Sequence, residues 1–333
     1  MNKCLITKLS GNSSNTALLK IGEMRIKFDK VAAPTKGTQG LGLMASKAVT
    51  LQIIGDGYFT DDSLSENKGK TLILNPADNH FVVSGNTSEV AILDKYSLTN
   101  VRLDFTGLST SDLYGKNKRL SIDDLKYSTS LIYIYLRNTT NIIGNISSLE
   151  NLTGLNYLDL GGSQVTGDIS SLKNLTGLNY LNLNDTQVTG DISSLKNLTG
   201  LTSVSFNNTQ VTGDISSLEN LSKAKNIYFT KCTLVGDLAT LPADCKYIVS
   251  GRDSVFTWST RPSSSNIVGM SGSFKIINLD KMLQDLAQCK VGFIESDSPG
   301  YKTIVVRGTR TSASDAAVST LQSKGYTVTI VPE

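Results

Sequence analysis

A repeat with a period of 23 residues is the feature that most limits how this chain can fold. Three nearly identical segments start at Asn151, Asn174 and Asn197, and the second reads NLTGLNYLNLNDTQVTGDISSLK. A degenerate copy starts at Asn220, and an earlier copy contains Leu131 and, further on, IIGNISSL. Periods of about 20 to 50 residues are typical of solenoids, in which each coil covers the apolar face of the next. The repeat therefore predicts a solenoid with one continuous core.

Each repeat has the apolar pattern L-x-x-L-x-L, then a gap, and then V-x-G-x-I-x-x-L. In the second copy these positions are Leu178, Leu181, Leu183, Val188, Gly190, Ile192 and Leu195. The alternation of Leu181 and Leu183 predicts a short strand whose leucines face inward. Gly190 allows the backbone to turn, and we expect Ile192 and Leu195 to bring the chain back under the strand.

This pattern resembles the leucine-rich repeat. The resemblance implies an α/β solenoid with a 23-residue period, whose parallel strands line a concave face. Members of the family usually carry a small hydrogen-bonding residue, often Asn, nine positions along the repeat. Here that position holds Ser163, Thr186, Thr209 and Cys232. Because hydroxyl groups can make the same bonds to the backbone, we expect the loops to keep their shape.

Residues 1–95 do not repeat and are predicted to form a β-rich attachment module. AVTLQIIGDGYFT, KTLILNP and EVAILDKYSL have strand character and are separated by turn residues. We predict the solenoid over residues 96–245, opened by Leu98, Val101 and Leu103. CLITKLSGNSSNTALLKIGEMRI, GDGYFTD and DKYSLT resemble leader modules on leucine-rich repeat proteins of gut Bacteroidales and their tailed, crAss-like phages. That resemblance implies attachment of the solenoid to a virion.

Residues 246–333 depart from the repeat and mix strand and helix patterns. NLDKMLQDLAQC and SASDAAVSTLQSKGY have helical spacing, and Gly325 ends the second helix. YKTIVVRGT and TVTIVPE are predicted strands. We predict a strand–helix–strand continuation that caps the solenoid, because an open end would expose core. A separate α/β domain is the alternative.

No arrangement of residues points to catalysis or to cofactor binding. The single histidine, His80, is expected to be a surface or satisfied residue rather than a general base. No CxxC pair occurs, so we expect free buried thiols rather than disulfides or a metal site at Cys4, Cys232, Cys245 and Cys289. A P-loop, a G-x-S-x-G motif and a dinucleotide fingerprint are also missing. We expect no enzyme activity, no cofactor and no metal.

An aspartate follows glycine once per repeat, at Asp168, Asp191, Asp214 and Asp237. Such a row could indicate a calcium ladder. One carboxylate per coil supplies few oxygen ligands for calcium, however. A role in the turn beside the glycine is therefore the favoured interpretation.

Residues between the inward leucines are predicted to face outward on the concave side. We propose as binding residues Arg102, Asp104, Tyr133, Tyr135, Arg137, Tyr157, Asp159, Tyr180, Asn182, Asn184, Ser205, Asn207 and Tyr228. Tyr133, Tyr157 and Tyr180 should align on adjacent coils, with Ser203 interrupting the row and Tyr228 resuming it. Exposed tyrosines among small polar residues are typical of recognition surfaces, on which a peptide or a sugar ring could stack. The alternative is that tyrosine simply suits a β surface.

Charge and hydropathy limit the partners. The net charge is +3, and the basic residues are spread along the chain rather than clustered. We therefore expect no nucleic-acid partner. No apolar run approaches the roughly 18 residues of a membrane helix, so we expect no membrane insertion. The start, MNKCLITKLSGN, lacks the apolar region of a signal peptide, so we expect synthesis in the bacterial cytoplasm.

The predicted function is non-catalytic recognition or adhesion, with a protein or glycan on the concave face. The phage resemblance implies a tail or fibre-type virion component that contacts the host surface, with the N-terminal module on other virion proteins. A purely structural virion subunit (collar, fibre or decoration) is one alternative. A bacterial surface adhesin whose leader was trimmed is another, and a homo-oligomer is left open.

Overall fold

The computed structural model describes the chain in blocks. These are residues 120–138, 142–266, 268–272, 274–291 and 302–332, with Ala48 and a set of earlier strands. The earlier strands are β1 (Met24–Lys27), β2 (Gly40–Ala45), β3 (Val49–Gly55), β4 (Tyr58–Thr60), β5 (Asn67–Gly69), β6 (Thr71–Leu74), β7 (Val82–Ser84), β8 (Thr87–Ile92) and β9 (Leu98–Asp104).

The first strands pair antiparallel, which confirms the predicted β-rich character of the N-terminal segment for the strands described. One sheet has the order β1-β8-β3-β6, and another has the order β5-β4-β7. β2 pairs antiparallel with β9. β9 then pairs in parallel with β11 (Tyr133–Tyr135), so it opens the solenoid as predicted. The domain boundaries near residues 95 and 245 stay predictions.

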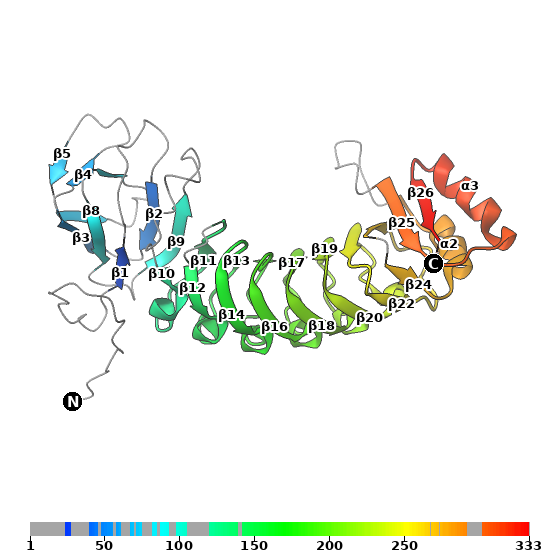
Figure 1. Cartoon of the computed structure of the whole chain (residues 1–333), viewed down its shortest axis with the longest axis horizontal. Coiled ribbons are helices and arrows are strands. Elements are labelled where there is room, and N and C mark those ends of the chain that lie inside the picture. The colour runs from blue at the N-terminus through cyan, green and yellow to red at the C-terminus, as the bar shows by residue number, and fades with distance from the viewer. Residues whose placement is uncertain are drawn as a thin grey trace.

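A parallel ladder of strands, here called the concave ladder, follows the inner side of an arch (Figure 1). From β9 it continues through β11, β13 (Tyr157–Asp159), β15 (Tyr180–Asn182), β17 (Ser203–Ser205), β19 (Asn226–Phe229), β21 (Tyr247–Ser250), β23 (Gly269–Ser271), β25 (Thr303–Arg307) and β26 (Thr327–Val331). Leu158 is in register with Leu181, 23 residues ahead. The ladder therefore has the same period as the sequence.

A second parallel ladder, the flank ladder, includes the segments around the repeat glycine, where a turn was predicted. It contains β10 (Leu120–Ser121), β12 (Ile142–Asn145), β14 (Gln164–Asp168), β16 (Gln187–Asp191), β18 (Gln210–Asp214), β20 (Thr233–Asp237), β22 (Val255–Thr257) and β24 (Lys275–Ile276). The prediction of a simple turn at Gly190 was therefore incomplete. Here Thr166 is in register with Gln187, which is 21 rather than 23 residues ahead. Equivalent residues of neighbouring coils are therefore displaced from each other by two positions in this ladder.

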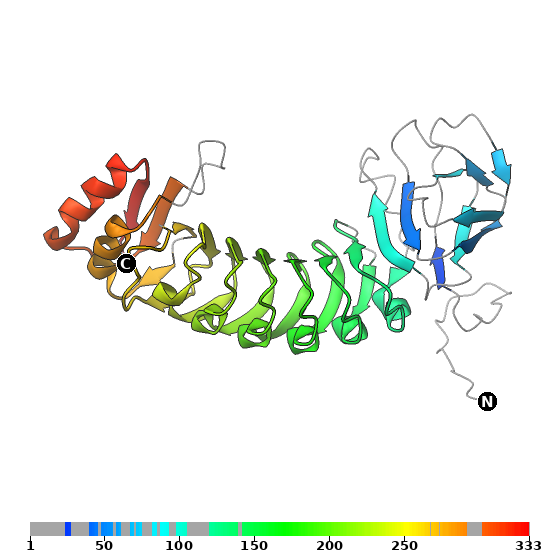
Figure 2. The ribbon, with the colours of Figure 1, turned by 180° about the vertical axis from the view of Figure 1, so that it is seen from behind.

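A short 3-10 turn closes each coil on the outer side of the arch (Figure 2). The turns span Ile122–Leu125, Ile146–Leu149, Ile169–Leu172, Ile192–Leu195, Ile215–Leu218 and Leu238–Thr240. The aspartate of each GD pair caps the turn that follows. Asp168 Oδ1, for example, accepts a hydrogen bond from the backbone N–H of Ser170 at 2.8 Å. This capping satisfies a donor at the start of the turn.

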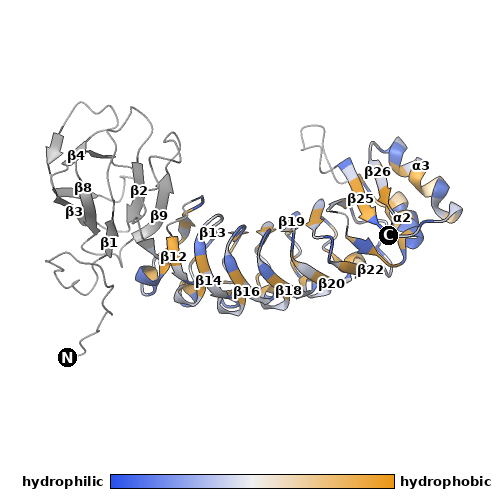
Figure 3. Ribbon diagram, in the orientation of Figure 1, coloured by the Kyte–Doolittle hydropathy of each residue, from blue (hydrophilic) through white to orange (hydrophobic). Residues whose placement is uncertain are grey.

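The core runs the length of the stack between these layers. Leu178, Leu181 and Leu183 are fully buried, as are their counterparts in neighbouring coils. Phe206 and Phe229 replace the last leucine of the pattern and stack 5.6 Å apart. Hydrophobic residues recur along successive strands from β12 to β20 (Figure 3). The predicted inward face is confirmed, and the fold is a leucine-rich repeat solenoid.

The C-terminal region has the predicted strand–helix–strand order. α2 (Leu279–Gln288) precedes β25, and α3 (Asp315–Ser323) joins β25 to β26. β25 and β26 extend the concave ladder in parallel. Arg261 ties this region to the last repeat, because its guanidinium donates to the carbonyls of Leu241 and Pro242 at 2.8 and 2.9 Å.

The thiols that the structure describes are free and buried, as predicted for Cys232, Cys245 and Cys289. Burial raises the pKa of Cys245 to about 11. Cys4 and His80 lie outside the described residues. No described helix is long and apolar enough to cross a membrane.

Candidate recognition surface on the concave ladder

Three tyrosines occupy the same position on adjacent strands of the concave ladder. Tyr133 is in register with Tyr157, and Tyr157 with Tyr180. All three side chains are half-buried, because each stands on the sheet between its neighbours. The predicted alignment of these three residues is confirmed, and we call them the tyrosine stack.

The rings of the tyrosine stack lie face to face. The centroids of Tyr133 and Tyr157 are 4.3 Å apart, with ring planes at 16°. Those of Tyr157 and Tyr180 are 4.5 Å apart, with planes at 5°. Both faces of Tyr157 are therefore covered. The stack offers ring edges and hydroxyl groups to a ligand, and a sugar ring has no free face of Tyr157 on which to lie.

The environment of Tyr157 and Tyr180 disfavours ionisation of their phenols. Burial raises the pKa of Tyr157 above the usual tyrosine value, and the nearby Tyr180 and Asp159 add to the effect. Burial also raises the pKa of Tyr180, and the charge of Asp159 contributes. The hydroxyl groups therefore remain hydrogen-bond donors at physiological pH.

The next outward position along each strand holds Asp159, Asn182 and Ser205, which were predicted to be exposed. That prediction is wrong, because these residues are 1%, 1% and 6% exposed. Each of the three is the last residue of its three-residue strand. Asp159 and Asn182 accept hydrogen bonds from the loop backbone two residues ahead. Their binding role remains a prediction, and their observed contacts are structural.

A chain of hydrogen bonds joins these polar residues across the coils. Asp159 Oδ1 accepts from the backbone N–H of Gly161 at 3.1 Å and from Asn182 Nδ2 at 2.8 Å. Asn184 Oδ1 accepts from Ser205 Oγ and from the backbone N–H of Asn207, both at 2.7 Å.

The chain continues one coil further along the solenoid. Asn207 Oδ1 accepts from the backbone N–H of Thr230 at 2.7 Å. Asn184 and Asn207, which were predicted to bind a ligand, thus also bridge neighbouring coils.

Asp159 is the one titratable residue among those named in this chain of bonds. Burial raises its pKa, against the lowering effect of the hydrogen bonds from Gly161 and Asn182 and of the charge on Arg137. Its Oδ2 atom is buried and has no hydrogen-bond partner among the described residues. Folding therefore favours the protonated form of this carboxyl group.

The predicted place of Tyr228 in the row is wrong. Tyr228 is in register with Ser205, in the column that contains Asn182. Asn226 occupies the row of the tyrosine stack, and Tyr247 follows it. The strand β19 is one residue longer than its predecessor, and its tyrosine lies at the second outward position. Tyr228 and Tyr247 meet edge to face, with centroids 6.0 Å apart at 70°.

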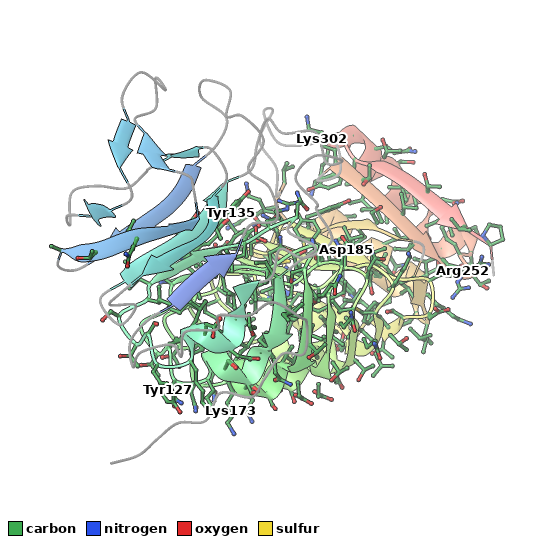
Figure 4. All side chains as sticks on the ribbon, turned by 60° about the vertical axis from the view of Figure 1, so that its left-hand side comes forward. Tyr127, Tyr135, Lys173, Asp185, Arg252 and Lys302 are labelled. Atoms are coloured by element: carbon green, nitrogen blue, oxygen red, sulfur yellow. The ribbon has the colours of Figure 1, made fainter. Side chains whose placement is uncertain are left out.

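The remaining predicted residues lie at the N-terminal end of the ladder. Tyr135 is half-buried, and its ring lies 6.4 Å from that of Tyr157. Arg137 is exposed just after β11. The backbone of Arg102 is in register with Tyr135, while the side chains of Arg102 and Asp104 are outside the described part. Tyr135 and Tyr127 lie on opposite sides of the solenoid (Figure 4).

At the ninth position of the repeat, three of the four residues make the expected hydrogen bond to the loop backbone. Thr186 Oγ1 donates to the carbonyl of Leu183 at 2.6 Å, and Thr209 Oγ1 donates to that of Phe206 at 2.7 Å. Cys232 Sγ donates to the same Phe206 carbonyl. Ser163 Oγ has no hydrogen-bond partner within the described part of the chain, so the expected bond is not seen at that coil.

The GD aspartates act as turn caps, as favoured over a calcium ladder. Each accepts from the backbone N–H two residues ahead, at 2.8 to 2.9 Å. In the part of the chain that the structure describes, no group of three or more His, Cys, Asp or Glu side chains is placed to hold a metal ion.

Comparisons with known proteins give similarity to leucine-rich repeat structures. No model of a known protein family matches the chain, and no curated protein is significantly similar. An internalin of Listeria monocytogenes has 21% identity and a TM-score of 0.43, over 72% of this chain and 69% of that one. Internalin C2 of the same organism has 21% identity and a TM-score of 0.34, over 62% and 84%. The ectodomain of the Arabidopsis receptor kinase HAESA, crystallised with a peptide hormone, has 24% identity and a TM-score of 0.40, over 52% and 31%.

Proposed function

We propose that this protein is a non-catalytic recognition module that binds a protein partner through its concave ladder. The observation that carries the proposal is the tyrosine stack, a rigid and half-exposed row on the inner side of the arch. Rings that hold each other in place lose little conformational freedom on binding. Their hydroxyl groups supply hydrogen bonds to a partner.

A protein partner fits this surface better than a glycan. The faces of Tyr157 are covered, and the polar groups beside it are engaged in bonds between coils. A sugar needs several directional hydrogen bonds in addition to a stacking face. A protein needs fewer, because apolar and aromatic contacts carry much of its binding energy.

The finer proposal is that the partner is on the surface of gut Bacteroidales cells and that the module belongs to a phage virion. Its support is the resemblance of CLITKLSGNSSNTALLKIGEMRI, GDGYFTD and DKYSLT to leader modules of such phages. The N-terminal module would then attach to other virion proteins. Mass spectrometry should find the chain in purified virions, and its presence in host membranes instead would favour the adhesin.

The test of recognition is binding of the fluorescently labelled full chain to intact Bacteroidales cells. The informative variant is Tyr157→Ser with Tyr180→Ser, because serine occupies this position in the next coil at Ser203. Tyr127→Ala is the matched control, since Tyr127 is 59% exposed on the other side.

We expect saturable binding that the double variant weakens at least about tenfold and the control leaves unchanged. Mild protease treatment of the cells should abolish it, whereas removal of capsule should not. Equal binding by the natural chain and the double variant would contradict the proposal, as would binding to no strain.

A further inference from the structure

The tyrosine stack ends abruptly at Ser203. Tyr180 is in register with Ser203 on the next strand, and Ser203 with Asn226 on the strand after that. Among the described residues, Tyr157 is the only ring against Tyr180. One face of Tyr180 is thus in contact with Tyr157, and the opposite face is directed along the ladder toward the serine.

The position of Ser203 has no ring to continue the tyrosine stack. Neighbouring strands lie about 4.8 Å apart, so Tyr180 and Asn226 are separated by roughly 9.5 Å along the ladder. Rings within the stack are 4.3 to 4.5 Å apart, so one ring fits at this position. Ser203 is too short to fill it, and its hydroxyl makes no hydrogen bond to any described residue.

We infer that the position above Ser203 binds an aromatic side chain of a protein partner, which stacks on Tyr180 as the fourth ring. This inference rests on the proposed function and names the group that the concave ladder selects. An offset stack of aromatic rings is favourable beyond the area that it buries. Since the preceding rings are already aligned, the incoming ring meets a fixed surface.

The surroundings favour a phenol or another flat ring over a sugar. Asp159, Asn182 and Asn184 follow the tyrosines in the same two coils, and their side chains are already engaged in hydrogen bonds. On the far side, Asn226 Oδ1 is buried and accepts no hydrogen bond from any residue that the structure describes. The Asn226 amide can therefore rotate toward the hydroxyl group of an incoming phenol without losing a hydrogen bond at Oδ1.

The test uses N-acetyl-tyrosinamide as the probe and nuclear magnetic resonance of the full chain as the readout. We expect saturable shifts at Ser203 and Tyr180, with a dissociation constant in the millimolar range. N-acetyl-leucinamide and methyl glucoside are the comparison probes, and neither should shift these signals.

Ser203→Tyr is the informative variant, because the preceding coils already hold tyrosine at this position. It should fold, extend the stack and abolish the shifts. Thr212→Tyr is the matched control, since Thr212 is exposed on the flank ladder, and it should leave the shifts unchanged.

Three results would overturn the inference. The first is that N-acetyl-tyrosinamide does not shift the signals of Ser203 and Tyr180. The second is that the shifts persist in the Ser203→Tyr variant. The third is that only methyl glucoside causes shifts. Binding to cells distinguishes a failure of the aromatic-site inference from a failure of the proposed function. Binding lost in the Tyr157→Ser and Tyr180→Ser variant but kept in Ser203→Tyr would leave the function standing and remove the aromatic site.

Discussion

The carboxylate of Asp168 lies directly against Gly190 of the next coil. A Cβ atom at Gly190 would stand 2.5 Å from Asp168 Oδ1, and Gly190 has a φ of +116°. Gly213 lies against Asp191 in the same way. The GD pair therefore recurs for two linked reasons. The aspartate caps its own turn, and the glycine leaves room for the aspartate of the preceding coil.

Gly190→Ala should lower the free energy of unfolding by about 2 to 3 kcal/mol, because it combines a strained backbone with a displaced cap. Urea denaturation of the purified chain measures the effect. Gly154→Ala is the control, since its Cβ would meet no atom closer than 3.8 Å. The control should change stability by less than about 1 kcal/mol. Equal effects of the two substitutions would show that the contact with Asp168 is unimportant.

Lys231→Asn should stabilise the protein by about 0.5 to 1 kcal/mol. Lys231 has a φ of +64°, in the left-handed region that costs a side chain such as lysine energy. The equivalent loop positions hold Asn138, Asp185 and Asn208, which tolerate that region. Thermal unfolding detects the gain. Lys223→Asn, at another exposed site, should stay within about 0.5 kcal/mol, and a similar gain there would point to charge instead.

Asp159 should make the stability depend on pH in the opposite direction to a salt-bridged carboxylate. Burial raises its pKa in the folded state above the unfolded value of 3.8. Its contribution is therefore fully present below that value and is lost as the pH rises through the folded pKa. Asp159→Asn keeps an oxygen for Gly161 and removes the titration. The variant should gain stability relative to the natural chain between about pH 4 and pH 7. An unchanged difference across this range would refute the assignment.

Ionisation of the Tyr157 phenol should lower the stability of the fold at alkaline pH. Burial raises the pKa of its phenol above the unfolded value of 10.0, so its contribution is present below that pH and lost as the pH rises further. Tyr157→Phe keeps the ring stack without the titration. We expect this variant to lose less stability than the natural chain above that pH, measured by urea denaturation. Parallel losses in the two proteins would show that Tyr157 ionises equally in both states.

Periodicity predicts those parts of the fold that depend on burial. The inward leucines and the alignment of Tyr133, Tyr157 and Tyr180 follow from alternation at a fixed period, and both are confirmed. The flank ladder was missed because QVTGD contains only one inward apolar residue, too few for a strand pattern. Backbone bonding between coils, rather than side-chain burial, forms this second set of strands.

The candidate site was predicted less well than the fold. Alternation indicates the side of a strand, but not whether a polar residue on that side is exposed. Asp159 and Asn182 are buried and bond to each other across neighbouring coils, a relation that one repeat cannot reveal. The recurrence of Asp, Asn and Ser at one position was the available signal. The shift of Tyr228 by one column arose because the degenerate coil from Asn220 has a different order of residues.

The two-residue offset of the flank ladder has a consequence for how such a chain can grow. Copying a segment in tandem normally places identical residues opposite each other, and like charges so placed repel. Here Asp168 faces Thr189, Asp191 faces Thr212, and a neutral side chain again faces the next aspartate. Whole coils can therefore be added or lost by duplication without building a column of negative charge along the flank.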